Sequence, residues 1–365
     1  MKKILLITPT SNQVITFREK LIEALQKNDY EVSVLTLDDK YKKEIENKNV
    51  KFYFVEDKNR SVNPLKILSL KNRYYKVIKK INPDVVFTFM LKPNAFGVRA
   101  AKKAGVKQIF SMVEGTGDPF TYNTLKWKII RAVCCFLYKK SFRYSKKVFF
   151  LNNDDKKEFI DRKLVKENQC EIIHGIGVDL EKFAYKPVKN HKTFLMMARM
   201  LQTKGIYEYC ECAKIVKQKY PDAVFNYLGA EGSVKLSDIQ SYIDDGSVNY
   251  LGVTGDVRPY IEDCVANVLP SYKEGFGLVN AEAAAVGRLS ITCQTNGTRD
   301  TVIDGETGFL VPVGDAAALA DKAIWCIEHP EEAEQMGENA RNFAETNFNQ
   351  VTINEKVLRV LNDER

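Results

Sequence analysis

Short apolar runs alternate with longer amphipathic stretches along the first half of the chain. The runs at 3–8, 31–37, 50–55, 84–89 and 108–112 have the length and composition of parallel strands buried on both faces. The spacing of apolar positions predicts helices over 14–27, 64–80 and 92–104, and further strands are expected at 148–151 and 170–173. This alternation predicts a doubly wound α/β sheet, in which ligands bind beyond the carboxyl ends of the strands.

A second alternating series follows a polar segment around Pro187. Its strands are expected at 194–198, 223–228, 248–251, 266–269, 289–293 and 309–311. Its helices are expected at 205–219, 236–244, 257–262, 278–286 and 316–328. A break at 347–350 precedes a last helix at 351–361. The pattern therefore predicts two doubly wound domains, 1–187 and 188–346, joined by a linker.

Length and composition agree with two globular domains. The chain has 365 residues, of which 45% are hydrophobic and 28% are charged. Met1 and two lysines lead directly into a strand, and no apolar run reaches the length of a membrane span, so we expect neither a signal peptide nor a transmembrane anchor. Eight cysteines without a C-x-x-C pair indicate reduced residues of a cytoplasmic protein.

Charge is distributed unevenly along the chain. Residues 1–185 hold 37 Lys and Arg against 21 Asp and Glu, whereas the overall net charge is only +8. A basic first half favours an anionic partner, such as a membrane surface, a phosphate or a nucleic acid. A general richness in lysine is the alternative explanation.

One basic stretch also carries aromatic residues. Residues 119–153 contain eight Lys or Arg and no acid, and apolar and basic residues interleave over 124–147. This composition is typical of an amphipathic helix that lies on an anionic membrane. A core helix with a solvated charged face is the alternative. The membrane interpretation assigns the contact to Lys126, Trp127, Lys128, Arg131, Lys139, Lys140 and Arg143.

The segment 269–287 combines a strand end, a loop with two glycines and an Ala-rich helix. A helix start of this kind presents backbone N–H groups to an anion, and Gly275 and Gly277 permit close approach of the backbone to a ligand. Glu274 in the loop and Glu282 in the helix can face one cavity, where carboxylates accept hydrogen bonds from vicinal hydroxyls. Such a pair suits a ribose and a sugar.

Two cations follow the first strand of the second half. Arg199 and Lys204 lie between that strand and the next helix, where a guanidinium and an ammonium can clamp a diphosphate. Taken alone, the segment would be interpreted as carrying two ordinary surface cations. Their position in an otherwise acidic half favours the clamp.

These motifs together resemble family 4 glycosyltransferases. The resemblance rests on P-S-Y-K-E-G-F-G-L-V-N-A-E at 270–282, A-R-M-L-Q-T-K-G at 198–205 and H-G-I-G-V-D at 174–179. It implies a retaining enzyme with the GT-B fold, in which two Rossmann-like domains face each other across a cleft. It also implies that residues 347–365 cross back onto the first domain, and that the enzyme uses a UDP-sugar without a metal or other cofactor.

The resemblance gives each motif residue a role. It implies that Glu274 contacts the donor sugar and Glu282 the nucleotide ribose, and that Arg199 and Lys204 hold the diphosphate. The backbone of the intervening segment would surround sugar and phosphate, namely Gly275, Phe276, Gly277 and Leu278.

The first half resembles bacterial enzymes that extend undecaprenyl-diphosphate sugars, such as N-acetylgalactosaminyltransferases. The resemblance lies in T-F-R at 16–18, F-S-M-V-E-G-T-G at 110–117 and the basic stretch that follows. It implies a lipid-linked saccharide acceptor and a peripheral location on the inner face of the cell membrane. The candidate acceptor or sugar ligands are Arg18, Lys92, Asn94 and Glu114.

The sequence departs from the family pattern in its first loops. Residues 10–13 replace a Gly-Gly loop, and Lys92 and Asn94 stand where many relatives carry a histidine. Other interpretations are a transferase with a soluble acceptor, a GT-B epimerase, and a basic protein that binds nucleotides or nucleic acid. The two glutamates disfavour nucleic acid as a partner.

Overall fold

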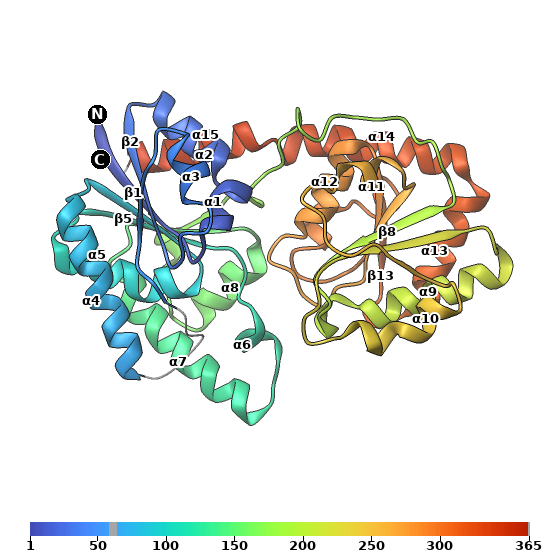
Figure 1. The fold of residues 1–365 in the computed structure, drawn as a ribbon, viewed down its shortest axis with the longest axis horizontal. Coiled ribbons are helices and arrows are strands. Elements are labelled where there is room, and N and C mark those ends of the chain that lie inside the picture. Colours follow the sequence, from blue (N-terminus) through green and yellow to red (C-terminus); the bar gives the residue numbers. More distant parts are fainter. Residues whose placement is uncertain (58–63, 364–365) are drawn as a thin grey trace. The chain divides into compact units, whose positions relative to one another are not determined.

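The computed structural model describes residues 1–57 and 64–363, which form two compact units (Figure 1). The first unit comprises 1–176 together with 351–365, and the second comprises 177–350. Residues 58–63, 364 and 365 of the predicted domains lie outside the described residues. Each unit is built around one parallel sheet.

The first sheet has the strand order β3-β2-β1-β4-β5-β6-β7. Its strands are Lys2–Ile7 (β1), Tyr30–Thr36 (β2), Lys51–Phe54 (β3), Val85–Phe89 (β4), Gln108–Val113 (β5), Lys147–Phe150 (β6) and Cys170–Ile172 (β7). The apolar run of β1 is fully buried, as expected for a central strand with helices on both faces.

Helices cover both faces of this sheet. They are Ser11–Phe17 (α1), Glu19–Lys27 (α2), Lys42–Glu46 (α3), Pro64–Ile81 (α4), Val98–Ala104 (α5), Asp118–Thr121 (α6), Leu125–Phe142 (α7), Asn153–Asp161 (α8) and Gln350–Asp363 (α15). A π-helical turn, Pro93–Gly97, precedes α5. The last helix returns to this unit, where Tyr30 Oη donates a hydrogen bond to Asn362 Oδ1 over 3.0 Å.

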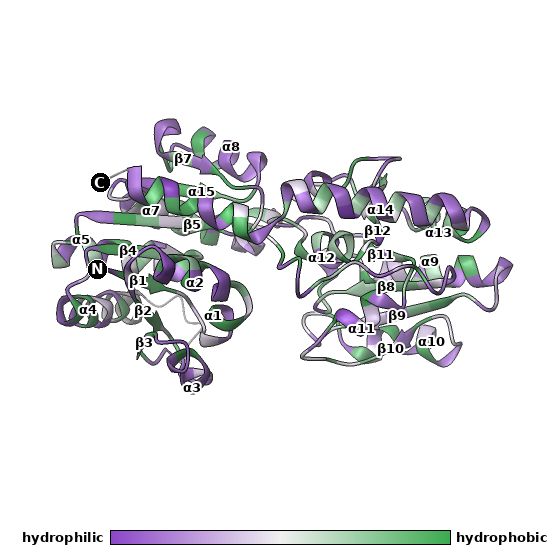
Figure 2. Cartoon of the chain, turned by 90° about the horizontal axis from the view of Figure 1, so that it is seen from above, coloured by the Kyte–Doolittle hydropathy of each residue, from purple (hydrophilic) through white to green (hydrophobic). Residues whose placement is uncertain are grey.

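The second sheet has the order β10-β9-β8-β11-β12-β13. Its strands are Thr193–Met197 (β8), Val224–Leu228 (β9), Asn249–Tyr250 (β10), Ala266–Leu269 (β11), Leu289–Cys293 (β12) and Gly308–Val311 (β13). Its helices are Ile206–Lys219 (α9), Gln240–Asp244 (α10), Arg258–Glu262 (α11), Leu278–Val286 (α12), Ala316–Glu328 (α13) and Pro330–Asn347 (α14). In Figure 2, α13 and α14 carry hydrophilic faces.

The boundary between the units lies at 176/177 and not at 187/188 as the sequence predicted. Residues 178–187 form hydrogen bonds with other parts of the second unit. Val178 N–H donates to Phe348 O at 2.7 Å, and the fully buried guanidinium of Arg288 donates to the carbonyls of Lys186 and Pro187. The polar composition that predicted a linker therefore belongs to an anchored segment.

Some predicted helices have other limits. The helix expected at 14–27 is divided at Arg18, which leaves helical geometry between α1 and α2. The helix expected to extend to 147 ends at Phe142, because Lys147 already pairs with Phe110 in the sheet. Four helices, α3, α6, α8 and α14, were not predicted.

Candidate active site

The order of the second sheet reverses between β8 and β11. β8 is flanked by β9 on one side and by β11 on the other, so the connections leave it in opposite directions. This is the switch point at which doubly wound sheets bind ligands. The two loops that leave the carboxyl ends of β8 and β11 carry Arg199, Lys204 and Glu274.

Close backbone contacts fix these two loops against each other. Gly205 has φ +73°, and a Cβ there would lie 2.2 Å from Pro270 O, so glycine is required. The same two loops are also joined by a hydrogen bond of 2.9 Å, which Tyr272 N–H donates to Thr203 O. The loop that bears Lys204 is thereby held on the loop that bears Glu274.

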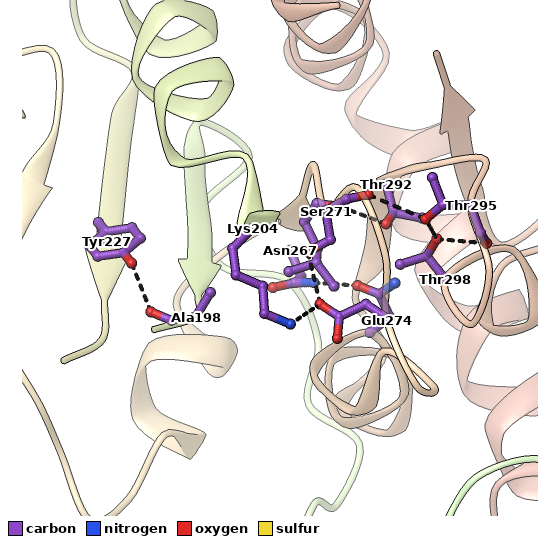
Figure 3. A network of polar contacts seen from close by, with 11 residues as sticks. Ala198, Lys204, Tyr227, Asn267, Ser271, Glu274, Thr292, Thr295 and Thr298 are labelled. Atoms are coloured by element: carbon purple, nitrogen blue, oxygen red, sulfur yellow. Dashed lines mark hydrogen bonds and ion pairs between the residues drawn. The ribbon is translucent and has the colours of Figure 1, made fainter. Parts of the chain in front are cut away.

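The side chains of Lys204 and Glu274 form an ion pair (Figure 3). Lys204 Nζ lies 2.5 Å from Glu274 Oε1, and Ser271 Oγ donates to the same oxygen at 2.8 Å. The side chains keep 22% and 14% exposure. Glu274 Oε2 accepts no hydrogen bond from the described part of the chain. One carboxylate oxygen is therefore held by the protein and the other is available to a hydroxyl.

A third strand end supports the same loop. Glu274 N–H donates to Asn296 O at 3.1 Å, and a Cβ at Gly297 would lie 2.6 Å from Glu274 O. Thr295 Oγ1 donates to Ser271 O at 3.3 Å. Sequence reasoning missed these supporting residues, although Ser271 belongs to the motif that identified Glu274.

Helix α12 starts directly after this loop. Gly277 adopts φ +81° and leaves the N–H groups of Leu278 and Val279 at the first turn, where no preceding turn can accept from them. These donors and the helix dipole favour an anion. The ring of Phe276 is buried against Phe348, with centroids 5.3 Å apart, so this residue offers a ligand its backbone.

A buried amide network fixes α12 to the sheet. Asn267 Nδ2 on β11 donates to Asn280 Oδ1 at 2.8 Å, and Asn280 Nδ2 donates to Thr301 Oγ1 at 3.0 Å. Asn280 was not singled out in the sequence, because its place between the two glutamates carries no separate signal. It holds the helix that bears Glu282.

Glu282 is the fifth residue of α12 and is partly buried. Burial raises its pKa to about 7, and the nearby Lys182 ammonium opposes this rise. Its side chain forms no hydrogen bond with the residues that the structure describes. Arg199, by contrast, is exposed and has no side-chain partner in the described ranges. Both groups can take an external partner without losing an internal one.

In the first unit, Arg18 and Glu114 bind each other. Arg18 is 2% exposed, forms an ion pair with Glu114 and lies over the ring of Phe89, with its Cζ 4.3 Å from the ring centroid. Burial lowers the pKa of Arg18 to about 9. The pair lies at the carboxyl ends of β4 and β5, with Arg18 buried and Glu114 partly accessible.

The predicted ligand Asn94 lies inside the unit, where its side chain already has internal partners. Asn94 is 0% exposed, accepts from Thr88 Oγ1 at 2.7 Å and donates to Met112 O at 2.8 Å. It joins β4 to β5 inside the unit. Lys92 is partly exposed and pairs with Asp57 over 2.7 Å.

The loop at 10–13, which replaces the Gly-Gly loop of relatives, is hydrogen-bonded to a carboxylate of this chain. Ser11 N–H donates to the two carboxylate oxygens of Asp38 at 3.3 and 3.2 Å, and the Ser11 hydroxyl also contacts this carboxylate. The Asp38 carboxylate therefore occupies the N-terminus of α1, a position at which a phosphate would otherwise bind.

Helix α7 exposes an apolar stripe. Leu125, Ile129, Val133 and Phe136 recur at helical spacing with exposed fractions of 75, 58, 48 and 59%. The ring of Trp127 stacks on Tyr122, with centroids 5.6 Å apart. Within 1–57 and 64–363, none of the helices combines the length and apolar composition of a membrane-spanning segment.

Comparison with known proteins identifies the family. Residues 178–343 match the model of the group 1 glycosyl transferases, and residues 3–152 match a glycosyl transferase 4-like model. The chain is 30% identical over 340 residues, 89% of each chain, to the N,N'-diacetylbacillosaminyl-diphospho-undecaprenol alpha-1,3-N-acetylgalactosaminyltransferase of Campylobacter jejuni.

Two further relatives extend this comparison. A UDP-Gal:alpha-D-GlcNAc-diphosphoundecaprenol alpha-1,3-galactosyltransferase of Escherichia coli is 27% identical, covering 85% of this chain and 83% of its own. The structure of Anabaena HepE with UDP and glucose superimposes with a TM-score of 0.80 at 19% identity over the full length of both chains, which shows the GT-B fold. The chain therefore belongs to the group 1 glycosyltransferases and is a hexosyltransferase.

Proposed function

We propose that this enzyme is a retaining glycosyltransferase that moves a sugar from a UDP-sugar to an undecaprenyl-diphosphate-linked saccharide. The observation that carries the donor half of the proposal is the ion pair of Lys204 and Glu274 at the switch point of the second sheet. Beside the start of α12 there is thus a cation, together with a carboxylate that has one oxygen without a hydrogen bond from the described residues. A nucleotide sugar combines the diphosphate and the hydroxyls that these groups recognise.

In the proposed reaction, the bond between the sugar C1 and the diphosphate oxygen breaks while C1 bonds to the acceptor hydroxyl on the same face. The acceptor proton passes to the departing phosphate oxygen, and UDP leaves. Arg199, Lys204 and the N-terminus of α12 stabilise the charge that develops on the diphosphate. This arrangement needs no bound metal, so we expect turnover to persist in a chelator.

The sugar and the ribose are assigned to the two glutamates. The free oxygen of Glu274 accepts from a sugar hydroxyl, and Glu282 accepts from the ribose when it is ionised. We propose a hexosamine such as GalNAc as the donor sugar, supported by the N-acetylgalactosaminyltransferase activity for which the Campylobacter jejuni relative is named.

The acceptor is assigned to the first unit. Both curated relatives named above act on undecaprenyl-diphosphate-linked sugars, and the first half of this chain is basic. Glu114, partly accessible beside the buried Arg18, is the proposed acceptor ligand. The exposed stripe of α7 and its lysines are proposed to lie on the inner face of the membrane, where this acceptor is embedded.

Release of UDP from candidate UDP-sugars, measured with and without a polyprenyl-diphosphate saccharide, tests the proposal. We expect release to require this acceptor, and Glu274→Ala to lower kcat by roughly a hundredfold or more. Glu332→Ala, which removes an exposed carboxylate of α14 with 62% side-chain exposure, is the matched control and should retain wild-type turnover. Retention is checked by NMR of the product's anomeric proton.

Two outcomes would contradict parts of the proposal. Wild-type turnover by Glu274→Ala would refute the assignment of the donor site. Equal UDP release with a soluble sugar and no lipid-linked acceptor would favour the alternative of a soluble acceptor.

A further inference from the structure

An open pocket in the first unit lies apart from the residues assigned to donor and acceptor. It has a volume of about 480 Å³ and lies between the C-terminal half of α7 and the end of α8 with the segment that follows it. Its apolar lining comes from Phe136, Ile160, Leu164 and Val165. A pocket of this size can hold a lipid headgroup and the first part of an acyl chain.

Five cations surround the apolar lining, and none of the described carboxylates does. They are Lys139, Lys140, Arg143, Lys163 and Lys166. All five are exposed, and none forms an ion pair within the described part of the chain. Five like charges around one pocket create a positive local potential, which attracts an anion.

The lining is rigidly built. Tyr138 and Phe142 on α7 lie with their ring centroids 5.1 and 6.2 Å from that of Phe159 on α8. Gln169 Nε2 donates to Phe142 O at 3.3 Å and to Ser145 O at 2.6 Å, which fixes the pocket's far edge to the end of α7. These contacts hold together the two segments that bear the five cations.

Lys163 occupies a backbone position that suits glycine. It has φ +55°, and the bonds from Lys163 N–H to Ile160 O and from Leu164 N–H to Phe159 O close the C-terminus of α8. Glycine is the usual residue at such a helix end, because a side chain is strained there. Local backbone stability therefore favours glycine over lysine at this position.

We propose that this pocket binds one anionic phospholipid of the membrane, with its phosphate among the five cations and an acyl chain along Phe136 and Ile160. Phe136 also belongs to the exposed stripe of α7, so the pocket is continuous with the proposed membrane-facing surface. The inference rests on the proposed membrane attachment of α7 and adds a specific lipid site to it.

Short-chain lipids dissolved as monomers test the pocket separately from the membrane. Titration with dihexanoyl phosphatidylglycerol should show saturable binding, whereas dihexanoyl phosphatidylcholine and inorganic phosphate should bind much more weakly. In Lys139→Ala/Lys166→Ala, binding should weaken by roughly fivefold for each cation removed. Lys79→Ala/Lys80→Ala, which removes two exposed charges of α4 in the same unit, should bind as the wild type does.

Lys163→Gly provides a variant that does not threaten folding. It removes a cation and relieves the strained backbone, so its thermal unfolding midpoint should equal or exceed that of the wild type while lipid binding weakens. Undiminished binding by Lys163→Gly and by the double variant would overturn the proposal. Equal affinity for inorganic phosphate would also overturn it, because the site would then be a simple anion site.

Vesicle flotation and UDP release separate this inference from the proposed function. If wild-type protein floats with phosphatidylglycerol vesicles and transfers sugar but does not bind the short-chain lipid, the pocket assignment fails and the membrane and transferase proposals stand. If it binds the short-chain lipid but transfers no sugar, the transferase proposal fails and the lipid site stands.

Discussion

At the scale of single residues, the candidate donor site depends on which polar groups already have hydrogen-bond partners within the protein. Glu274 has one oxygen held by Lys204 and Ser271, whereas Glu282 is partly buried without a bonding partner in the described ranges. The sequence placed both on one loop and helix, but it could not show this difference. Burial and hydrogen bonding, which decide it, arise from residues distant in the chain.

The raised pKa of Glu282 predicts opposite effects of pH on stability and on donor binding. Because the folded protein holds this proton more tightly than the unfolded chain, stability should fall as the pH rises from about 4.5 to about 7. Affinity for the UDP-sugar should rise over the same range, because the ionised carboxylate accepts ribose hydroxyls.

Thermal unfolding between about pH 5 and pH 8 checks the first effect, and calorimetric titration with UDP checks the second. Glu282→Gln should flatten both profiles and weaken UDP binding at pH 8. Profiles of Glu282→Gln that follow the wild type would show that another group titrates.

At the scale of elements, the active-site loops are positioned by close backbone contact. Gly205 and Gly246 have nearly the same φ, +73° and +75°, but a Cβ at Gly205 meets Pro270 O whereas one at Gly246 meets nothing within 4 Å. The two positions therefore separate backbone strain from the contact that joins the loops.

Gly205→Ala should impair both stability and donor binding, whereas Gly246→Ala should lower stability alone. Left-handed backbone strain costs each variant about 1 kcal/mol of unfolding free energy. Only Gly205→Ala should also displace the loop of Lys204 and raise the KM for the UDP-sugar, by roughly tenfold or more. Urea unfolding and steady-state kinetics measure both quantities, and equal KM values in the two variants would contradict the proposed clamp.

The same scale explains why the sequence did not predict the two longest of the missed helices, α14 and α8. Helix α14 is buried through Ala333, Met336, Gly337, Ala340 and Ala344. Small residues give a weak hydrophobic signal, yet they allow close packing: a Cβ at Gly337 would lie 2.4 Å from Gly287 O. Helix α8 is mostly polar and is started by Asn152, whose side chain accepts from Asp155 N–H at 2.7 Å.

At the scale of the whole molecule, one buried arginine anchors the segment that leads into the second sheet. Arg288 Nη1 donates to Lys186 O at 2.6 Å, and Nη2 donates to Pro187 O at 3.2 Å and to Glu262 O at 2.9 Å. The structure gives the arginine a role as an anchor of the segment 186–187.

Arg288→Met should destabilise the protein by about 3 kcal/mol, because it leaves several backbone carbonyls without donors. Arg359→Met, on the exposed face of α15, is the control and should change the unfolding free energy by less than about 0.5 kcal/mol. Urea denaturation of the full chain measures both. A loss below about 1 kcal/mol for Arg288→Met would show that water replaces the guanidinium.

The sequence by itself determined the architecture of both sheets and the positions of the donor-site motifs. Buried parallel strands are continuous apolar runs, and the ends of such strands fall at fixed points in the motif. These are local signals, so Arg199, Lys204 and Glu274 could be placed at strand ends without a structure.

The tertiary structure alone decided which polar residues remain available. Asn94 and Arg18 looked like ligands, but strands and helices distant in the sequence bury them and supply their partners. It likewise assigned 178–187 to the second unit and gathered five cations from α7 and the end of α8 around one pocket. Burial and pairing depend on contacts between remote segments, which local periodicity does not encode.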